Sequence, residues 1–197
     1  KLANSLCERP AHTEFHLLKP AQGHRIMGMS LATVVLSFNH PNHTKRCLES
    51  LAAFDCGPIY LVHNGSQLAF VDELKKAFPQ IHHLVIQENR GYSGGANHGI
   101  RKAFADGFEN VFFLTNDTWL KKLDVDYVLG ELRKRPALLG PKIEIRNTGK
   151  VGSFGGLVNF KTGHLSHLRE ARAEIKKQNA KSYVPGTAFF VNRRAWL

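Results

Sequence analysis

The hydrophobic pattern of the chain predicts alternating strands and helices between residues 31 and 135. Short runs that are apolar on both faces predict strands buried in a parallel sheet. These runs are Leu31–Phe38, Ile59–Val62, His83–Gln87 and Asn110–Leu114. Apolar residues at helical spacing predict a helix capped by Thr44, and further helices over residues 68–78, Gly95–Ala105 and Asp124–Arg135. Alternation of this kind indicates a parallel sheet with crossover helices.

The pattern changes after residue 136 and indicates a second, α+β part. Apolar segments separated by glycine-rich turns predict strands over Ala137–Ile145, Val151–Phe160 and Tyr183–Asn192. The polar segment between the last two is predicted to be helical over Glu170–Lys177, or else a loop. We therefore divide the chain into an α/β half, residues 29–135, predicted to bind the ligand at its strand ends, and a half with mixed or antiparallel strands, residues 136–197. Residues 1–28 show no regular period and are interpreted as a tag or an upstream extension.

Polar residues follow each of the four predicted parallel strands. They are Asn39, His63-Asn64, Glu88-Asn89 and Asn116-Asp117. Because parallel sheets bind ligands beyond the carboxyl ends of their strands, these residues predict a crevice. The stretch from Glu88 to Ile100 carries four glycines and leads into a predicted helix. A glycine-rich turn at a helix N-terminus suits a phosphate group, and a carboxylate at a strand end can hold a divalent cation.

The composition excludes several classes of protein. With 197 residues, of which 43% are hydrophobic and 22% charged, the chain is long enough for a core and is neither disordered nor fibrous. The apolar runs are too short to predict a transmembrane helix. Three cysteines without a CxxC pair argue against a disulfide framework and a zinc cluster, and favour a reducing, cytoplasmic compartment.

The net charge of +11 leaves several kinds of anionic partner open. Nucleic acid, an anionic membrane surface and phosphorylated ligands all attract such a chain. A protein with a high isoelectric point and no such partner is an equally good interpretation. The basic clusters are scattered over predicted helices and turns and are not interleaved with aromatic residues, which disfavours nucleic acid. Peripheral contact with the inner face of a membrane remains compatible with the charge.

Five short motifs follow one another in the chain. They are Ser37-Phe38-Asn39, His63-Asn64-Gly65-Ser66, the run from Asn89 to Gly99, Thr115-Asn116-Asp117 and the run from Pro185 to Phe190. Together they resemble the inverting family-2 glycosyltransferases of the GT-A fold, especially the rhamnosyltransferase-like branch. The resemblance extends from Leu31 to Leu197. It implies an α/β fold of the GT-A (Rossmann-like) type: a mostly parallel central sheet, helices on both faces, and a smaller mixed or antiparallel C-terminal part.

The resemblance also implies an activity. A hexose or deoxyhexose would move from a UDP-, dTDP- or GDP-linked donor to a hydroxyl group of a polysaccharide or a lipid-linked glycan, with inversion at the anomeric carbon. The half formed by residues 29–135 would bind the nucleotide sugar, and the half formed by residues 136–197 would lie on the acceptor side. The implied nucleotide-sugar-binding residues are Ser37, Asn39, His63, Asn64, Asn89, Arg90, Gly91, Asn97, Asn116, Asp117 and Gly186. Asp117 would also hold Mg²⁺ or Mn²⁺. We expect weak binding of the metal, because Thr115 stands where the family has its first acidic residue.

Two features depart from the family pattern. His63 stands where relatives carry an aspartate that bonds the base. Either the base differs (thymine or guanine in place of uracil), or base recognition is looser, or His63 is a satisfied histidine at a strand end. The family's general base lies beyond the position of Leu197, so we interpret the chain as truncated. A catalytically incomplete nucleotide-sugar-binding module is therefore the alternative to an active glycosyltransferase.

Overall fold

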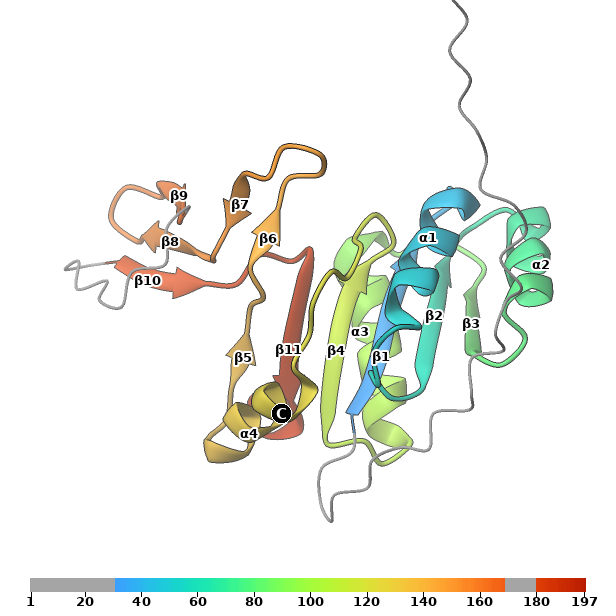
Figure 1. Ribbon diagram of the computed structural model, residues 1–197, viewed down its shortest axis with the longest axis horizontal. Helices are drawn as coiled ribbons and strands as arrows, with labels where there is room; N and C mark the ends of the chain where they lie inside the picture. Colours follow the sequence, from blue (N-terminus) through green and yellow to red (C-terminus); the bar gives the residue numbers. More distant parts are fainter. Residues whose placement is uncertain (1–30, 169–179) are drawn as a thin grey trace, which may run out of the picture.

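The computed structural model describes residues 31–168 and 180–197 (Figure 1). The helices are α1 (Pro41–Leu51), α2 (Leu68–Ala77), α3 (Gly91–Ala105), α4 (Val125–Lys134) and α5 (Arg193–Trp196). The strands are β1 (Leu31–Ser37), β2 (Ile59–Asn64), β3 (His82–Ile86), β4 (Asn110–Thr115), β5 (Leu138–Leu139), β6 (Ile143–Glu144), β7 (Val151–Ser153), β8 (Gly156–Asn159), β9 (Leu165–His167), β10 (Ala180–Tyr183) and β11 (Ala188–Asn192). The interpretation of residues 1–28 and the predicted helix over residues 170–177 lie outside the described residues.

The central sheet has six strands in the order β3-β2-β1-β4-β11-β5. β1 to β4 pair in parallel, whereas β11 runs antiparallel to β4, and β5 runs antiparallel to β11. β2 lies on one side of β1 and β4 on the other, so the chain changes direction across the sheet at β1. A change of this kind leaves a crevice at the carboxyl ends of the two strands concerned. The topology therefore places a candidate site at the ends of β1 and β4.

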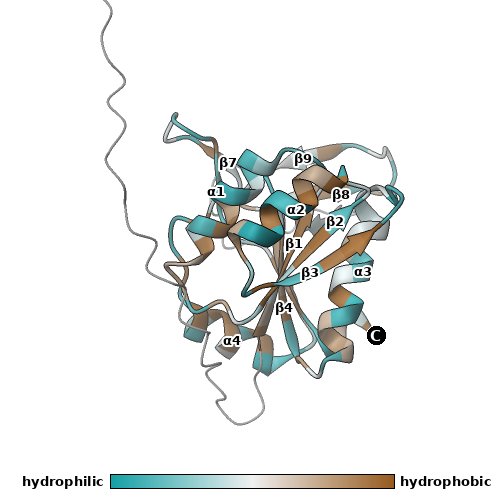
Figure 2. Ribbon diagram, turned by 90° about the vertical axis from the view of Figure 1, so that its right-hand side faces the viewer, coloured by the Kyte–Doolittle hydropathy of each residue, from teal (hydrophilic) through white to brown (hydrophobic). Residues whose placement is uncertain are grey.

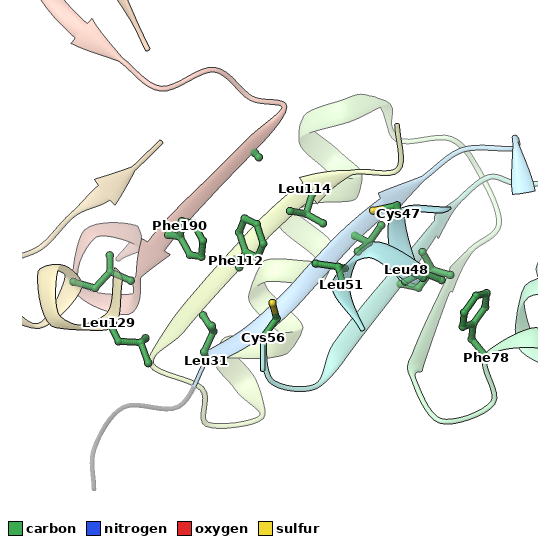
Figure 3. Close-up of a cluster of buried hydrophobic side chains, with 14 of the residues drawn as sticks. Leu31, Cys47, Leu48, Leu51, Cys56, Phe78, Phe112, Leu114, Leu129 and Phe190 are labelled. Atoms are coloured by element: carbon green, nitrogen blue, oxygen red, sulfur yellow. The ribbon is translucent and has the colours of Figure 1, made fainter. Parts of the chain in front are cut away.

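Helices cover both faces of the central sheet. On one face α1 and α4 bury Leu48 and Leu129 in a cluster with Phe112 of β4 and Phe190 of β11, whose ring centroids are 4.0 Å apart (Figure 3). On the other face α3 buries Ile100 in a second cluster formed with β1, β2 and β4. In Figure 2 the strands of this sheet are largely brown, whereas the helices carry both colours. This pattern is that of amphipathic helices on a sheet buried from both sides.

The C-terminal part forms shorter strands than the sequence predicts. The segment 137–145 is not one strand: it divides into β5 and β6, which belong to different sheets. The segment 151–160 divides into β7 and β8, and the segment 183–192 into the end of β10 and β11. Each break contains a glycine or a proline. Pro141 and Pro185 cannot donate to a ladder, and Gly155 has a φ of 113°.

Two helices begin earlier than predicted. α1 begins at Pro41, because the fixed φ of proline and its missing N–H suit the first position of a helix. Thr44 is therefore not the cap; it is buried inside the first turn, and its hydroxyl lies 2.9 Å from that of Ser37. α3 begins at Gly91 rather than Gly95. The predicted start of α4 is confirmed, since Asp124 caps it by accepting a hydrogen bond from the Tyr127 N–H.

The structure confirms the predicted fold class. The central sheet is mostly parallel with helices on both faces, and two small antiparallel sheets, β10-β8-β9 and β6-β7, belong to the C-terminal part. Figure 1 shows these small sheets on the side of β5 and β11, away from α2 and β3. Within the described ranges, no helix has the length and apolar character that a bilayer crossing requires.

Candidate functional site

A cavity of about 610 Å³ lies at the carboxyl ends of β1 and β4, where the topology predicts a crevice. We call it the strand-end cavity. It is lined by Leu36, Phe38, Asn64, Asn89, Gly91, Tyr92, Thr115, Asn116, Asp117, Gly186 and Thr187. Six residues that the sequence nominated for nucleotide-sugar binding are in this set: Asn64, Asn89, Gly91, Asn116, Asp117 and Gly186. Segments far apart in the chain thus meet around one hollow.

Asn64 holds the glycine-rich turn in place. Its amide nitrogen donates to the side-chain oxygen of Asn89 at 3.0 Å and to the carbonyl oxygen of Gly91 at 2.9 Å. Its amide oxygen accepts from the Arg90 N–H at 3.0 Å. Asn64 is buried, and these three bonds use most of its hydrogen-bonding capacity. Its side chain therefore shapes the cavity wall, and the N-terminus of α3 with it.

The N-terminus of α3 faces the cavity. Asn89 accepts a hydrogen bond from the Gly91 N–H at 2.8 Å, and helix geometry leaves the N–H groups of Tyr92 and Ser93 without intrahelical partners. The helix can lie this close to the sheet because position 95 is a glycine. A Cβ at Gly95 would lie 2.5 Å from the side chain of Leu36. The structure thus gives Gly95 a packing reason, and places backbone donors at the cavity rim.

Asn116 fixes the end of β4 against β1 and α1. Its N–H donates to the carbonyl oxygen of Leu36 at 3.0 Å, and its side-chain amide donates to the hydroxyl of Thr44 at 2.9 Å. The same amide lies 3.4 Å from the hydroxyl of Ser37. Because Ser37 is only 1% exposed, its hydroxyl serves this internal network and does not line the cavity.

Asp117 is the one carboxylate among the residues that line the strand-end cavity. It is exposed, and one of its oxygens accepts a hydrogen bond from the Thr115 hydroxyl at 2.5 Å. Among the described residues, no group of three or more histidine, cysteine or acidic side chains is placed to hold a metal ion. A single oriented carboxylate fits Mg²⁺ or Mn²⁺ whose other ligands are phosphate oxygens and water.

Five residues that line the cavity were not nominated from the sequence for nucleotide-sugar binding: Leu36, Phe38, Tyr92, Thr115 and Thr187. Tyr92 is 45% exposed; its ring packs edge-on against Phe113, and its hydroxyl donates to the Gly186 carbonyl at 2.5 Å. Burial raises the pKa of Tyr92, so the hydroxyl keeps its proton. Phe38 and Tyr92 both fall inside the motifs of the sequence, so their places beside Ser37 and Gly91 were a usable signal.

Three other nominated residues lie outside the cavity lining. Asn39 has a φ of 53° and bridges two loops, since its side chain accepts from the Gln67 N–H at 3.1 Å. It lines a separate cavity of about 410 Å³ between the N-termini of α1 and α2. Arg90 is exposed and contributes its backbone N–H to Asn64. Asn97 lies in the second turn of α3 and is not part of the lining.

His63 also lies outside the lining, because its ring is 0% exposed and faces a second histidine. The rings of His63 and His83 are stacked with centroids 5.2 Å apart, and His63 Nε2 lies 2.9 Å from His83 Nδ1. His83 Nε2 lies 3.0 Å from the Phe78 carbonyl oxygen. Since that oxygen can only accept, His83 donates to it and accepts from His63. Burial, His83 and Lys75, in that order, lower the pKa of His63 to about 4.

The sequence profile described as Glycosyl transferase family 2 matches residues 33–196. The chain belongs to this family. The match spans the central sheet, apart from the first two residues of β1, and every residue that lines the strand-end cavity. The predicted family is therefore confirmed at this level, while the rhamnosyltransferase-like branch stays a prediction.

Similar proteins include the uncharacterized proteins Mb1552 of Mycobacterium bovis and Rv1525 of Mycobacterium tuberculosis. Each is 32% identical over 110 residues, which are 55% of this chain and 38% of the relative. Among solved structures, S. aureus TarS in a fragment bound to UDP superposes with a TM-score of 0.51 at 17% identity, over 69% of this chain and 43% of that one. The same fragment in a second crystal structure has a TM-score of 0.50 at 19% identity, over 60% and 37% of the two chains. This chain thus spans less than half the length of these relatives, and the structural likeness concerns the fold.

Proposed function

We propose that the strand-end cavity binds a nucleotide-diphosphate sugar, and that the protein transfers this sugar to a hydroxyl group with inversion of the anomeric carbon. The observation that carries the proposal is the meeting of Asn64, Asn89, Asp117 and Gly186 at the ends of β1 and β4. These residues come from four of the five motifs that resemble family-2 glycosyltransferases. The proposed sugar is a hexose or deoxyhexose carried on UDP, dTDP or GDP.

In this proposal the diphosphate binds at the N-terminus of α3. The first-turn N–H groups of Tyr92 and Ser93 are donors of the kind that bind phosphate, and the helix dipole adds a partial positive charge. Gly91 has a φ of 68°, and no atom lies within 4 Å of the place a Cβ would take, so the backbone is open to a ligand there. Arg90 beside it can pair with phosphate oxygens.

In this proposal the nucleobase contacts residues other than His63, because the His63 ring is buried and donates a hydrogen bond to His83. Phe38 is 46% exposed at the end of β1 and lines the cavity, so its ring offers a flat apolar surface to a base. The absence of an aspartate at position 63 leaves UDP, dTDP and GDP open as carriers. A panel of donors is therefore the direct test.

Asp117 is the proposed protein ligand of Mg²⁺ or Mn²⁺. When bound, the cation would neutralise the negative charge that develops on the departing diphosphate. The Thr115 hydroxyl donates a hydrogen bond of 2.5 Å to an Asp117 carboxylate oxygen and so orients this carboxylate, which lines the cavity. Because one carboxylate is a small ligand set, we expect the metal to bind together with the donor rather than ahead of it.

The acceptor is a hydroxyl group of a polysaccharide or of a lipid-linked glycan in this proposal. An inverting transfer needs a general base that takes the proton of that hydroxyl. Asp117 is committed to the cation, and Glu170 and Glu174 lie outside the described residues, so the base is assigned to no residue here. A cytoplasmic location, at the inner face of a membrane, belongs to the same proposal.

A thermal-shift panel with UDP-, dTDP- and GDP-sugars, each with and without Mn²⁺, tests the donor site. A ligand that binds only the folded state at a hundredfold excess over its Kd stabilises it by about 2.7 kcal/mol. For a chain of this size, that raises Tm by roughly 5–11 °C. The Asp117→Asn variant should lose the part of this rise in Tm that depends on Mn²⁺. The control variant Asp126→Asn, in the first turn of α4, should keep it. No response to any donor would reject the proposal.

A second candidate function is a nucleotide-sugar-binding module that does not transfer the sugar. It is favoured by the presence of a single carboxylate in the strand-end cavity. Release of nucleoside diphosphate, measured with and without a mixture of hydroxyl acceptors, separates the two candidates. Donor binding without turnover in the full-length protein would favour the module.

A further inference from the structure

A row of four side chains, one of which is two residues from Asp117 in the sequence, lies outside the strand-end cavity. The guanidinium carbon of Arg146 lies 4.7 Å from the ring centroid of Trp119. The Trp119 centroid is 6.4 Å from that of His43, and the His43 ring is stacked on His40 at 5.6 Å. We call His40, His43, Trp119 and Arg146 the Arg146 surface. None of the four lines the strand-end cavity.

The Arg146 surface is assembled from three separate parts of the chain. His40 and His43 belong to the start of α1, Trp119 follows β4, and Arg146 lies in the turn between β6 and β7. Trp119 is two residues from Asp117, so the Cα atoms of the two residues lie within roughly 7 Å of each other. Figure 1 shows the turn between β6 and β7 reaching toward the end of the sheet at which α1 begins. The surface therefore borders the chain segment that carries the proposed metal ligand.

Arg146 is held in place but is not neutralised. Its side chain is exposed, and in the described ranges no carboxylate forms an ion pair with it. The acidic residue of the same hairpin, Glu144, is already bonded by Lys121 and Lys142, each at 2.6 Å. Contact with the Trp119 ring restrains the guanidinium, and its N–H groups stay available to a ligand. The hairpin thus presents an oriented cation to solvent.

The chemistry of the surface selects an anionic ligand over a neutral sugar. A neutral sugar would stack its apolar face on an open aromatic ring, but Arg146 covers one face of Trp119. In the two segments that form this surface, residues 117–122 and 142–146, the cations Lys121, Lys122, Lys142 and Arg146 outnumber Asp117 and Glu144. A planar guanidinium fork matches carboxylate and phosphate oxygens, and exposed imidazoles can add hydrogen bonds to them.

We propose that the Arg146 surface is a subsite for a carboxylate or phosphate group of the acceptor glycan, an inference that rests on the proposed glycosyl transfer. Bound there, the anionic group anchors the acceptor while a neighbouring hydroxyl points into the strand-end cavity. The surface binds the acceptor through charge, and it remains distinct from the diphosphate site at α3. Acceptors that carry negative charge are therefore the preferred class.

Tryptophan fluorescence reports directly on this surface. The chain has two tryptophans, so the Trp196→Phe variant leaves Trp119 as the single reporter. The probes are oligogalacturonate, a dextran bearing phosphate groups, neutral dextran of matched length, and vesicles containing phosphatidylglycerol. We expect at least one anionic glycan to bind and neutral dextran not to bind. In the Trp196→Phe background, Arg146→Gln should weaken glycan binding about tenfold. Arg146→Lys should weaken it less, because lysine keeps the positive charge but not the planar guanidinium.

Lys150→Gln is the matched control, since it removes one positive charge from the same hairpin without touching Trp119. It should change glycan affinity less than about twofold. Equal binding of neutral dextran, equal effects of Arg146→Gln and Lys150→Gln, or no glycan binding would overturn the inference. Binding to vesicles alone, dependent on Arg146, would overturn it in favour of a membrane contact. The donor thermal-shift panel is read separately: a donor response without glycan binding rejects only the subsite, whereas glycan binding without any donor response rejects the proposed function.

Discussion

Acidification should destabilise the protein through His63, and the His63→Gln variant should lose that part of the pH dependence. The pKa of the covered His63 ring is lowered to about 4, chiefly by burial and then by His83 and Lys75. Because the pKa in the folded state lies below the unfolded value of 6.5, the unfolded chain binds the proton more tightly. The stabilisation is therefore fully present above about pH 6.5 and is lost as the pH falls toward 4.

The size of the effect follows from the two pKa values. With 6.5 in the unfolded chain and about 4 in the folded one, linkage predicts a loss of about 2 kcal/mol between about pH 7.5 and about pH 5. For a chain of this length, the loss corresponds to a fall in Tm of roughly 4–8 °C. The pKa of His83 is also lowered, with burial as the main cause, so protonation of His83 acts in the same direction.

Urea unfolding followed by far-UV circular dichroism at a series of pH values measures this loss. In the His63→Gln variant, the glutamine amide can still donate to His83 but does not titrate, so the difference from the wild type isolates His63. His43→Gln, which removes an exposed imidazole, is the control and should keep the wild-type profile. The reasoning is refuted if the His63→Gln variant loses as much unfolding free energy on acidification as the wild type does. It is also refuted if NMR shows that the His63 ring of the folded protein titrates near pH 6.5.

Three further predictions concern the strand-end cavity. Asn64→Ala should lower the free energy of unfolding, measured by chemical denaturation, by about 3 kcal/mol, since three hydrogen bonds of a buried amide are lost. The control variant Asn42→Ala, at an exposed position, should lower it by less than about 0.5 kcal/mol. Tyr92→Phe removes the bond to Gly186 and should weaken donor binding roughly fivefold by calorimetry, for a loss of about 1 kcal/mol; unchanged affinity would show that this bond does not shape the site. Asp117→Asn should abolish Mn²⁺-stimulated donor binding while leaving metal-independent binding within about twofold, and an unchanged response to Mn²⁺ would place the metal elsewhere.

The sequence predicted the parallel part of the central sheet because the patterns that define its strands and helices lie between residues close in the chain. Strands β1 to β4 are apolar runs bounded by turn residues, and their helices show apolar stripes at helical spacing. The polar residues at the strand ends, among them Asn64 and Asp117, could be nominated for a site because parallel topology brings such ends to one edge. The short strands of the C-terminal part were harder to predict, because single glycines and prolines divide apolar segments that read as continuous.

The tertiary structure alone decided which nominated side chains face the cavity. Ser37 and His63 are polar residues at strand ends, as Asn64 is, yet Ser37 joins the hydroxyl of Thr44 and His63 joins the ring of His83. The periodicity of a strand indicates which residues share a face, but it does not identify the neighbour that each side chain meets. Those neighbours come from other elements, so they are set by packing.

The sequence by itself determined the alternation of strands and helices, the order of the motifs, and the polar chemistry at the strand ends. Only the tertiary structure placed β11 antiparallel to β4, which brings Gly186 to the hydroxyl of Tyr92 across 94 residues of chain. It likewise brought Arg146 over Trp119 to form a basic surface that borders the segment carrying Asp117. Local propensity depends on residues close in sequence, whereas these contacts depend on the registers of strands and turns that are distant in it.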